Sequence, residues 1–87
     1  MPVRHVVVSV HDGMHARPVA ELARLAMAHP QPITLTTSAG TTVDIGSVLA
    51  VMDLALSAGD EVRLETTASP SADEVLDELV AVLDPRA

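Results

Sequence analysis

Hydrophobic and polar residues follow two rhythms along this chain. In some stretches hydrophobic residues occupy every second position, which is typical of a strand with one buried face. In others they recur every three or four residues, which is typical of a helix with one buried stripe. The first rhythm predicts strands over residues 3–10, 33–37, 41–45 and 61–67, and the second predicts helices over residues 16–29, 48–56 and 72–83.

The same rhythms predict which side chains form the core. The first strand is expected to bury Val6, Val8 and Val10. The two longer helices are expected to bury one stripe each, formed by Val19, Leu22, Ala23, Ala26 and Met27 in the first and by Val75, Leu76, Leu79, Val82 and Leu83 in the last. A helix with a single apolar stripe must pack that stripe on a sheet or on another helix.

Polar residues mark where two of the helices begin. Ser47 precedes the short helix and is expected to be its N-cap, whose side-chain oxygen accepts a free backbone N–H. Ser71 and Glu74 have the spacing of a capping box, in which each side chain accepts the backbone N–H of the other residue.

The order of the elements predicts the fold class. Strands and helices alternate as β-α-β-β-α-β-α, and Ser38-Ala39-Gly40 forms a turn signal between the second and third strands. A hairpin requires antiparallel strands. We therefore expect residues 1–87 to form one α+β domain, an open-faced sandwich with a four-stranded antiparallel sheet and helices on one face.

Composition excludes several classes of protein. The 87 residues are 48% hydrophobic and contain no aromatic side chain, so the core must be aliphatic. The lack of cysteine excludes disulfide scaffolds, thiolate catalysis and zinc ribbons. The net charge of −7 argues against a nucleic-acid partner, and no apolar run is long enough to enter a membrane. The first residues lack the layout of a signal peptide, so we expect a cytoplasmic protein.

The histidines do not predict a metal site. His11 and His15 are four residues apart, but they fall on a predicted loop, and no carboxylate or thiol completes a ligand set. His5 is expected on the strand face opposite Val6 and Val8, at the surface.

Residues 13–18, Gly-Met-His-Ala-Arg-Pro, place an imidazole at the start of a predicted helix. The first backbone N–H groups of a helix have no partner within it, and with the helix dipole they attract an anion. Arg17 adds a guanidinium that can hold two phosphate oxygens. This arrangement favours a phosphoryl group carried on His15 and held by the backbone of Ala16 and Arg17. From these residues alone, the alternative is that His15 is an ordinary polar residue beside a surface arginine.

Three motifs in order resemble one known family. Residues 13–19, Gly-Met-His-Ala-Arg-Pro-Val, resemble the signature of HPr, the small histidine-containing phosphocarrier of the phosphoenolpyruvate-dependent sugar phosphotransferase system. Residues 43–54 resemble the serine-phosphorylation segment of that family, and residues 58–62 resemble the start of its last strand. The spacing of the motifs and the chain length also match, and the resemblance covers about residues 3–84.

The resemblance implies roles for individual residues. His15 would carry the phosphoryl group on its Nδ1 atom, and Arg17 would steady the group and assist its release. Arg24 would contact partner proteins, and Ser47 would match a regulatory serine. The family fold is a four-stranded antiparallel sheet with three helices on one side, and its members have no independent turnover and no cofactor.

The resemblance also implies partners. Enzyme I would load His15 with a phosphoryl group that comes from phosphoenolpyruvate, and a sugar-specific Enzyme IIA would receive it during carbohydrate uptake. An HPr kinase/phosphorylase would act on Ser47. Gly46 stands where the family often has lysine, so Ser47 acting only as an N-cap stays an alternative. We expect a monomer, because a carrier must dock on several partners. A regulatory paralogue, of the nitrogen type or linked to dihydroxyacetone kinase, is the alternative function.

The short helix has more apolar residues than one face can bury. If Val51, Leu54 and Ala55 face the core, the side chains left over are Val48, Leu49 and Met52. An exposed apolar patch near a functional residue is typical of a partner surface. The alternative is a short helix that is buried on all sides.

Overall fold

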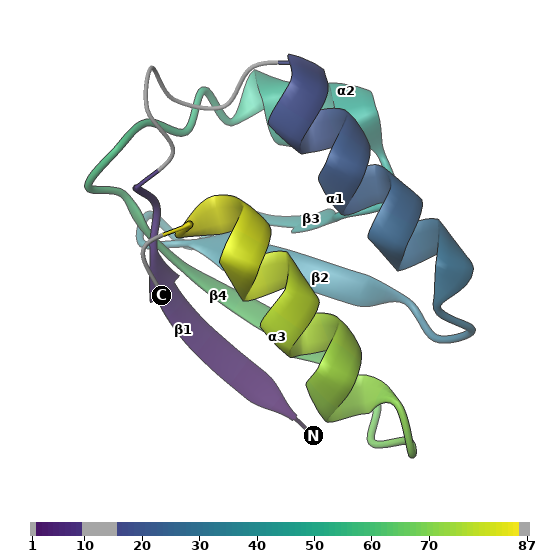
Figure 1. Cartoon of the computed structure of the whole chain (residues 1–87). Coiled ribbons are helices and arrows are strands. Elements are labelled where there is room, and N and C mark those ends of the chain that lie inside the picture. The colour runs from purple at the N-terminus through teal and green to yellow at the C-terminus, as the bar shows by residue number, and fades with distance from the viewer. Residues whose placement is uncertain (1, 10–15, 86–87) are drawn as a thin grey trace.

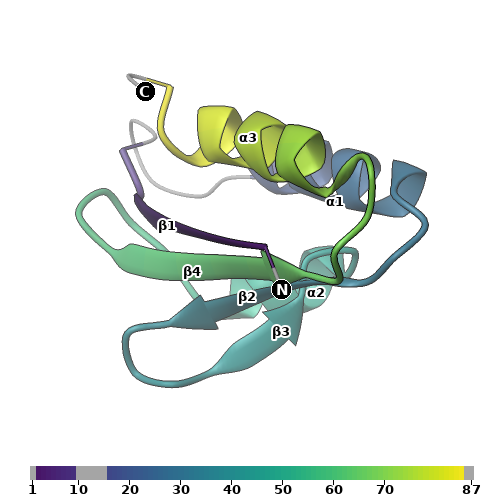
Figure 2. The same ribbon diagram turned by 90° about the horizontal axis from the view of Figure 1, so that it is seen from below.

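The computed structural model describes residues 2–9 and 16–85 and contains one antiparallel sheet (Figure 1). The strands are β1 (Val3–Val7), β2 (Ile33–Thr37), β3 (Thr42–Asp44) and β4 (Glu61–Thr66). The helices are α1 (Ala16–Ala28), α2 (Val48–Asp53) and α3 (Ala72–Leu83). Figure 2 shows α1 and α3 together on one side of the sheet, and the opposite side open. The predicted order of elements and the fold class are confirmed.

The sheet has the strand order β1-β4-β2-β3, so β4 and β2 are its central strands. Val6 of β1 lies opposite Val62 of β4, and Leu64 of β4 lies opposite Leu35 of β2. These four side chains are buried, because this register places them on the face that the helices cover. The alternation seen in the sequence thus becomes one continuous apolar face across three strands.

The core confirms most of the side chains that the sequence predicts. Leu22 of α1 and Leu76 and Leu79 of α3 are completely buried, and α1 and α3 pack against each other. Met27 was predicted to lie in the core, and this prediction is wrong, since 77% of the residue is exposed. It lines an open hollow together with Gly46 and Ser47, so no neighbouring element covers it.

Helix α2 is shorter than its sequence pattern predicts. It ends at Asp53, and Ala55 has a φ of 52°, which is a left-handed backbone conformation that stops a helix. The Ala55 N–H donates to the Met52 carbonyl at 3.1 Å, one of the hydrogen bonds of a helix C-terminal motif. Val51 is completely buried and Leu54 partly buried, but Ala55 is exposed, so its predicted place in the core is wrong.

One predicted helix cap is confirmed and the other is wrong. The Ser47 residue has an extended backbone, and its hydroxyl accepts the N–H of Ala50 at 3.3 Å. Ser71 precedes α3 but makes no side-chain cap hydrogen bond. Its backbone (φ −104°, ψ 5°) lacks the extended conformation that directs a hydroxyl toward the first turn, so the capping box does not form.

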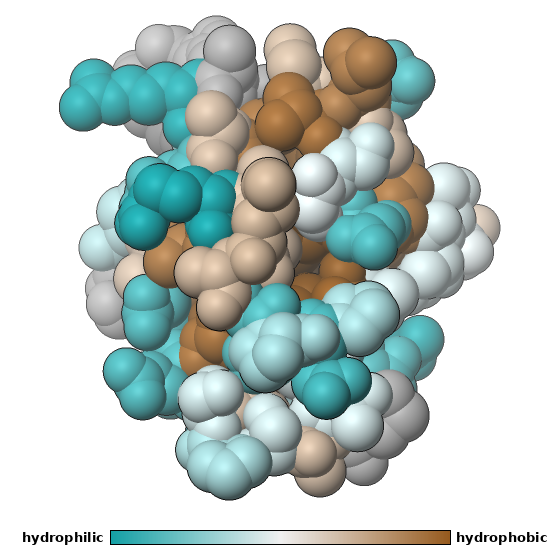
Figure 3. Space-filling model, turned by 90° about the vertical axis from the view of Figure 1, so that its right-hand side faces the viewer, coloured by the Kyte–Doolittle hydropathy of each residue, from teal (hydrophilic) through white to brown (hydrophobic). Residues whose placement is uncertain are grey.

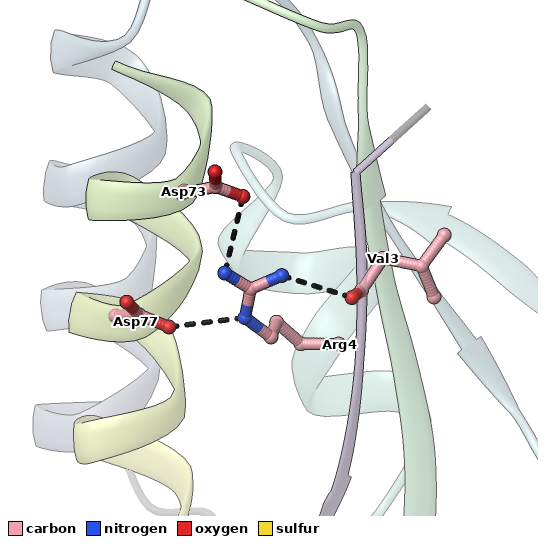
Figure 4. Close-up of polar contacts among 4 residues, drawn as sticks. All are labelled: Val3, Arg4, Asp73 and Asp77. Atoms are coloured by element: carbon pink, nitrogen blue, oxygen red, sulfur yellow. Dashed lines mark hydrogen bonds and ion pairs between the residues drawn. The ribbon is translucent and has the colours of Figure 1, made fainter. Parts of the chain in front are cut away.

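Polar contacts fasten β1 to α3 (Figure 4). The Arg4 guanidinium donates to Asp77 at 3.0 Å and to Asp73 at 3.1 Å, and it also donates to the Val3 carbonyl at 3.1 Å. The two aspartates raise the pKa of Arg4 above its ordinary value, with the Asp77 hydrogen bond as the larger cause. The first strand is thereby tied to the last helix by charge as well as by packing.

A membrane-spanning helix is not among the elements that the structure describes, because none is long and apolar enough.

Candidate functional site

The start of α1 is the centre of the candidate site. His15 and Gly13 lie outside the described residues, so the placement of the His15 ring stays a prediction. Helix α1 begins at Ala16, directly after His15 in the sequence, and is thirteen residues long. Its first backbone N–H groups therefore stand at the position where the sequence predicts an anion site.

Arg17 is exposed in the first turn of α1. No hydrogen bond or ion pair joins it to any other residue in the described part of the chain. It lines an open groove of about 410 Å³ with Pro18 and Glu21 and with residues at the end of α3 and just beyond it, namely Ala81, Val82 and Pro85. Because Arg17 has no partner within residues 2–9 and 16–85, its guanidinium can move onto a phosphoryl group without losing a contact to them.

Arg24 lies two turns further along α1 and has partners. Its Nε donates to Glu21 Oε2 at 3.1 Å, and a terminal nitrogen of the same guanidinium donates to Glu21 Oε1. These hydrogen bonds lower the pKa of Glu21 and raise the pKa of Arg24. Glu78 of α3 adds a weaker attraction on Arg24. The two arginines of α1 therefore differ: among the described residues Arg17 has no partner, whereas Arg24 is paired with Glu21.

Helix α2 exposes the apolar side chains that its sequence left without a place in the core. Leu49 is 77% exposed, Met52 41% and Val48 36%. The alternative of a helix buried on all sides is therefore wrong. Figure 3 shows hydrophobic side chains gathered at the end of the molecule where α2 lies.

Met27 extends this apolar region onto α1. It lines a hollow of about 450 Å³ together with Ser47, the residue directly before α2, and α1 packs against α2. We refer to Met27, Val48, Leu49 and Met52 as the apolar patch. The helical spacing of Met27 predicts a place in the core, and no signal in a single sequence distinguishes a covered helix position from an exposed one.

The other described polar groups do not form a second site of this kind. His5 is exposed, as predicted, whereas His29 is buried directly after α1, where its Nε2 has no hydrogen-bond partner among the described residues. A larger hollow of about 620 Å³ opens near the C-terminal end of α2, but its carboxylates, Asp53, Asp60 and Glu61, do not suit an anion. Within residues 2–9 and 16–85, no three acidic or histidine side chains meet as a metal site would require.

Comparison with known proteins assigns the family. The family model described as "PTS HPr component phosphorylation site" matches residues 3–84. The chain belongs to the HPr family. The Phosphocarrier protein HPr of Streptomyces coelicolor is 37% identical over 83 residues, which are 93% of this chain and 89% of that protein. The Phosphocarrier protein NPr of Escherichia coli K12 is 31% identical over 72 residues, 83% of this chain and 79% of that protein.

Solved HPr structures have the same fold. The HPr of Bacillus anthracis superposes with a TM-score of 0.85 at 30% identity, over 95% of this chain and 96% of that one. The HPr of Thermoanaerobacter tengcongensis gives the same TM-score, 0.85, at 24% identity, over 97% of this chain and 92% of that one. This member of the HPr family is a phosphocarrier of the phosphotransferase system and not an enzyme.

Proposed function

We propose that this HPr-family protein accepts a phosphoryl group on His15 from Enzyme I and passes it to a sugar-specific Enzyme IIA for carbohydrate uptake. Enzyme I takes the group from phosphoenolpyruvate onto a histidine of its own. The lone pair of His15 Nδ1 then forms a new P–N bond while the P–N bond to Enzyme I breaks. On transfer to Enzyme IIA the bond on His15 breaks in turn, so the carrier is regenerated.

The available Arg17 guanidinium at the start of α1 is the observation that carries this proposal. A phosphoryl group in transit concentrates charge on its oxygens, and positioning and charge stabilisation dominate the catalysis of its transfer. The N–H groups of the first turn of α1, including those of Ala16 and Arg17, would hold the group, and Arg17 would follow it. Arg17 is exposed, which suits a carrier that must release its cargo.

The apolar patch is the proposed docking surface for Enzyme I and Enzyme IIA. It lies on α1 and α2, with Met27 near the end of α1 and Arg17 near its start, so a partner that covers the patch and reaches His15 would extend along α1. A monomer in the cytoplasm would leave this surface accessible to both partners. Modification of Ser47 by an HPr kinase/phosphorylase stays a prediction, since the Ser47 hydroxyl already serves as the α2 cap.

Incubation with phosphoenolpyruvate and a purified sugar-type Enzyme I, followed by intact mass measurement, tests the proposal. We expect an acid-labile gain of one phosphoryl group in the wild-type protein and none in His15→Ala, with equal thermal melting of both. Labelling of His15→Ala at another histidine would contradict the assignment of the site.

A nitrogen-type regulatory carrier is the second candidate, and the similarity to Escherichia coli NPr favours it. Parallel reactions with a sugar-type and a nitrogen-type Enzyme I separate the two candidates. Faster loading of His15 by the nitrogen-type enzyme would replace the transport role with the regulatory one.

A further inference from the structure

The two arginines of α1 alone suggest a positively charged helix surface, but a carboxylate lies between them. Glu21 lies between Arg17 and Arg24 on the exposed side of the helix and accepts hydrogen bonds from Arg24 through both of its carboxylate oxygens. A bidentate contact of this kind holds a guanidinium in one orientation, because two parallel hydrogen bonds restrict its rotation.

The contacts of Glu21 place its carboxylate on the side of α1 that faces α3, and helical spacing places Arg24 between Glu21 and Met27. Glu21 lines the groove that it shares with Ala81 and Val82 of α3. Glu78, the second carboxylate that attracts Arg24, also belongs to α3 and lines a hollow with Ala28 of α1. The apolar patch lies on the other side, where Met27 borders Ser47 and α2.

We propose that Glu21 determines the partner specificity of the apolar patch by holding the Arg24 guanidinium toward α3. The patch then meets its partner without the Arg24 guanidinium, and Arg24 contributes little to docking. This inference rests on the proposed function, because it concerns the partner that loads His15. Glu21 is a positioning residue that acts through Arg24 and not on the phosphoryl group.

Two consequences follow for the choice of partner. A partner with an apolar docking surface is accepted, and its binding depends weakly on salt because Arg24 forms no ion pair with it. A partner that relies on acidic residues to attract a cation at position 24 is disfavoured, since it must compete with Glu21 for the guanidinium.

A double-mutant cycle in phosphoryl transfer from Enzyme I tests the inference. The wild-type protein, Glu21→Gln, Arg24→Gln and the combined variant are compared by their KM for loading, at several salt concentrations. We expect Arg24→Gln to change the KM less than about twofold, and Glu21→Gln to change it by about threefold or more and to steepen its salt dependence. These factors correspond to the usual strength of a single exposed charge contact. The combined variant should return to the wild-type KM, and kcat should stay constant throughout.

The control is Glu74→Gln, which removes the same charge from α3 at a residue that does not act on Arg24. It should leave the KM unchanged, which separates the effect of Glu21 from that of net charge.

A KM that rises about fivefold or more in Arg24→Gln alone would overturn the inference, because Arg24 would then contact the partner directly. Equal KM values in all four proteins would also overturn it and would leave the carrier function intact. If the wild-type protein accepts no phosphoryl group at all, the proposed function fails and the inference fails with it.

Discussion

Replacement of Ala55 by glycine should stabilise the protein. Ala55 has a φ of 52° directly after the C-cap of α2. A left-handed conformation costs an L-residue about 1–2 kcal/mol, whereas glycine adopts it freely. Glycine also loses more backbone entropy on folding, by about 0.4–1 kcal/mol. Ala55 is exposed, so no cavity is created. The difference is a net gain of about 0.5–1 kcal/mol in the free energy of unfolding, or about 2–8 °C in Tm for a domain of this size.

Urea titration and calorimetry of Ala55→Gly measure this gain, and two variants provide matched controls. Gly40 has a φ of 91°, and a Cβ added there meets no atom within 4 Å, so Gly40→Ala tests backbone strain alone and should destabilise. Ala20→Gly lies on the exposed side of α1 and should cost about 1 kcal/mol. A loss in Ala55→Gly that resembles the loss in Ala20→Gly would refute the reasoning. Helix α2 would then continue to residue 56, as its sequence pattern predicts.

Three further predictions concern the surface. Arg17→Ala should slow loading and unloading of His15 by roughly tenfold to several hundred-fold, equivalent to about 1.4–3.5 kcal/mol of lost transition-state stabilisation, and quench-flow transfer at the wild-type rate would contradict this. Arg17→Lys should recover only part of the rate, because lysine lacks the two-point contact. Met52→Asp should raise the KM for Enzyme I while the free energy of unfolding changes by less than about 0.5 kcal/mol, and a large drop in Tm would place Met52 in the core. Arg24 lowers the pKa of Glu21 below the ordinary carboxyl value of 4.5. The ion pair therefore stabilises the fold above pH 4.5, and this stabilisation is lost as the pH falls through the lowered pKa of the folded protein. The difference in urea midpoint between the wild-type protein and Glu21→Gln should therefore shrink below pH 4.5.

The fold was predictable because its strands and helices have clear hydrophobic periods. Alternation placed Val6 and Val8 on the buried side of the first strand, and helical spacing placed Leu76 and Leu79 in the core, as the structure confirms. Periodicity indicates only that a residue lies on a given side of a helix. Whether anything covers that side depends on elements distant in sequence, which is why Met27 was assigned to the core and is exposed.

The remaining errors have local causes that hydrophobicity does not encode. The end of α2 depends on the left-handed backbone at Ala55, a conformation that alanine rarely adopts and that its sequence context does not reveal. The capping box failed because Ser71 has the right side chain but the wrong backbone. At the candidate site, the motif around His15 predicted Arg17, but the pairing of Arg24 with Glu21 depends on side-chain geometry that spacing alone does not determine.

The strand order β1-β4-β2-β3 also constrains how this protein is made. A ribosome releases β1 first. The neighbour of β1 in the sheet is β4, which begins at Glu61, 58 residues after the start of β1 at Val3. At about 5–20 residues per second, β1 waits roughly 3–12 s for its partner strand to be synthesised. During that interval Val6 and Val8 cannot reach the apolar face that buries them, and the backbone of β1 is open to pairing with other chains. The β2–β3 hairpin can form while the chain is still growing, whereas the sheet closes only when β4 and then α3 emerge. Newly made chains therefore depend on rapid closure by β4 and α3, and a stop codon before residue 61 would release a chain whose first strand has no partner.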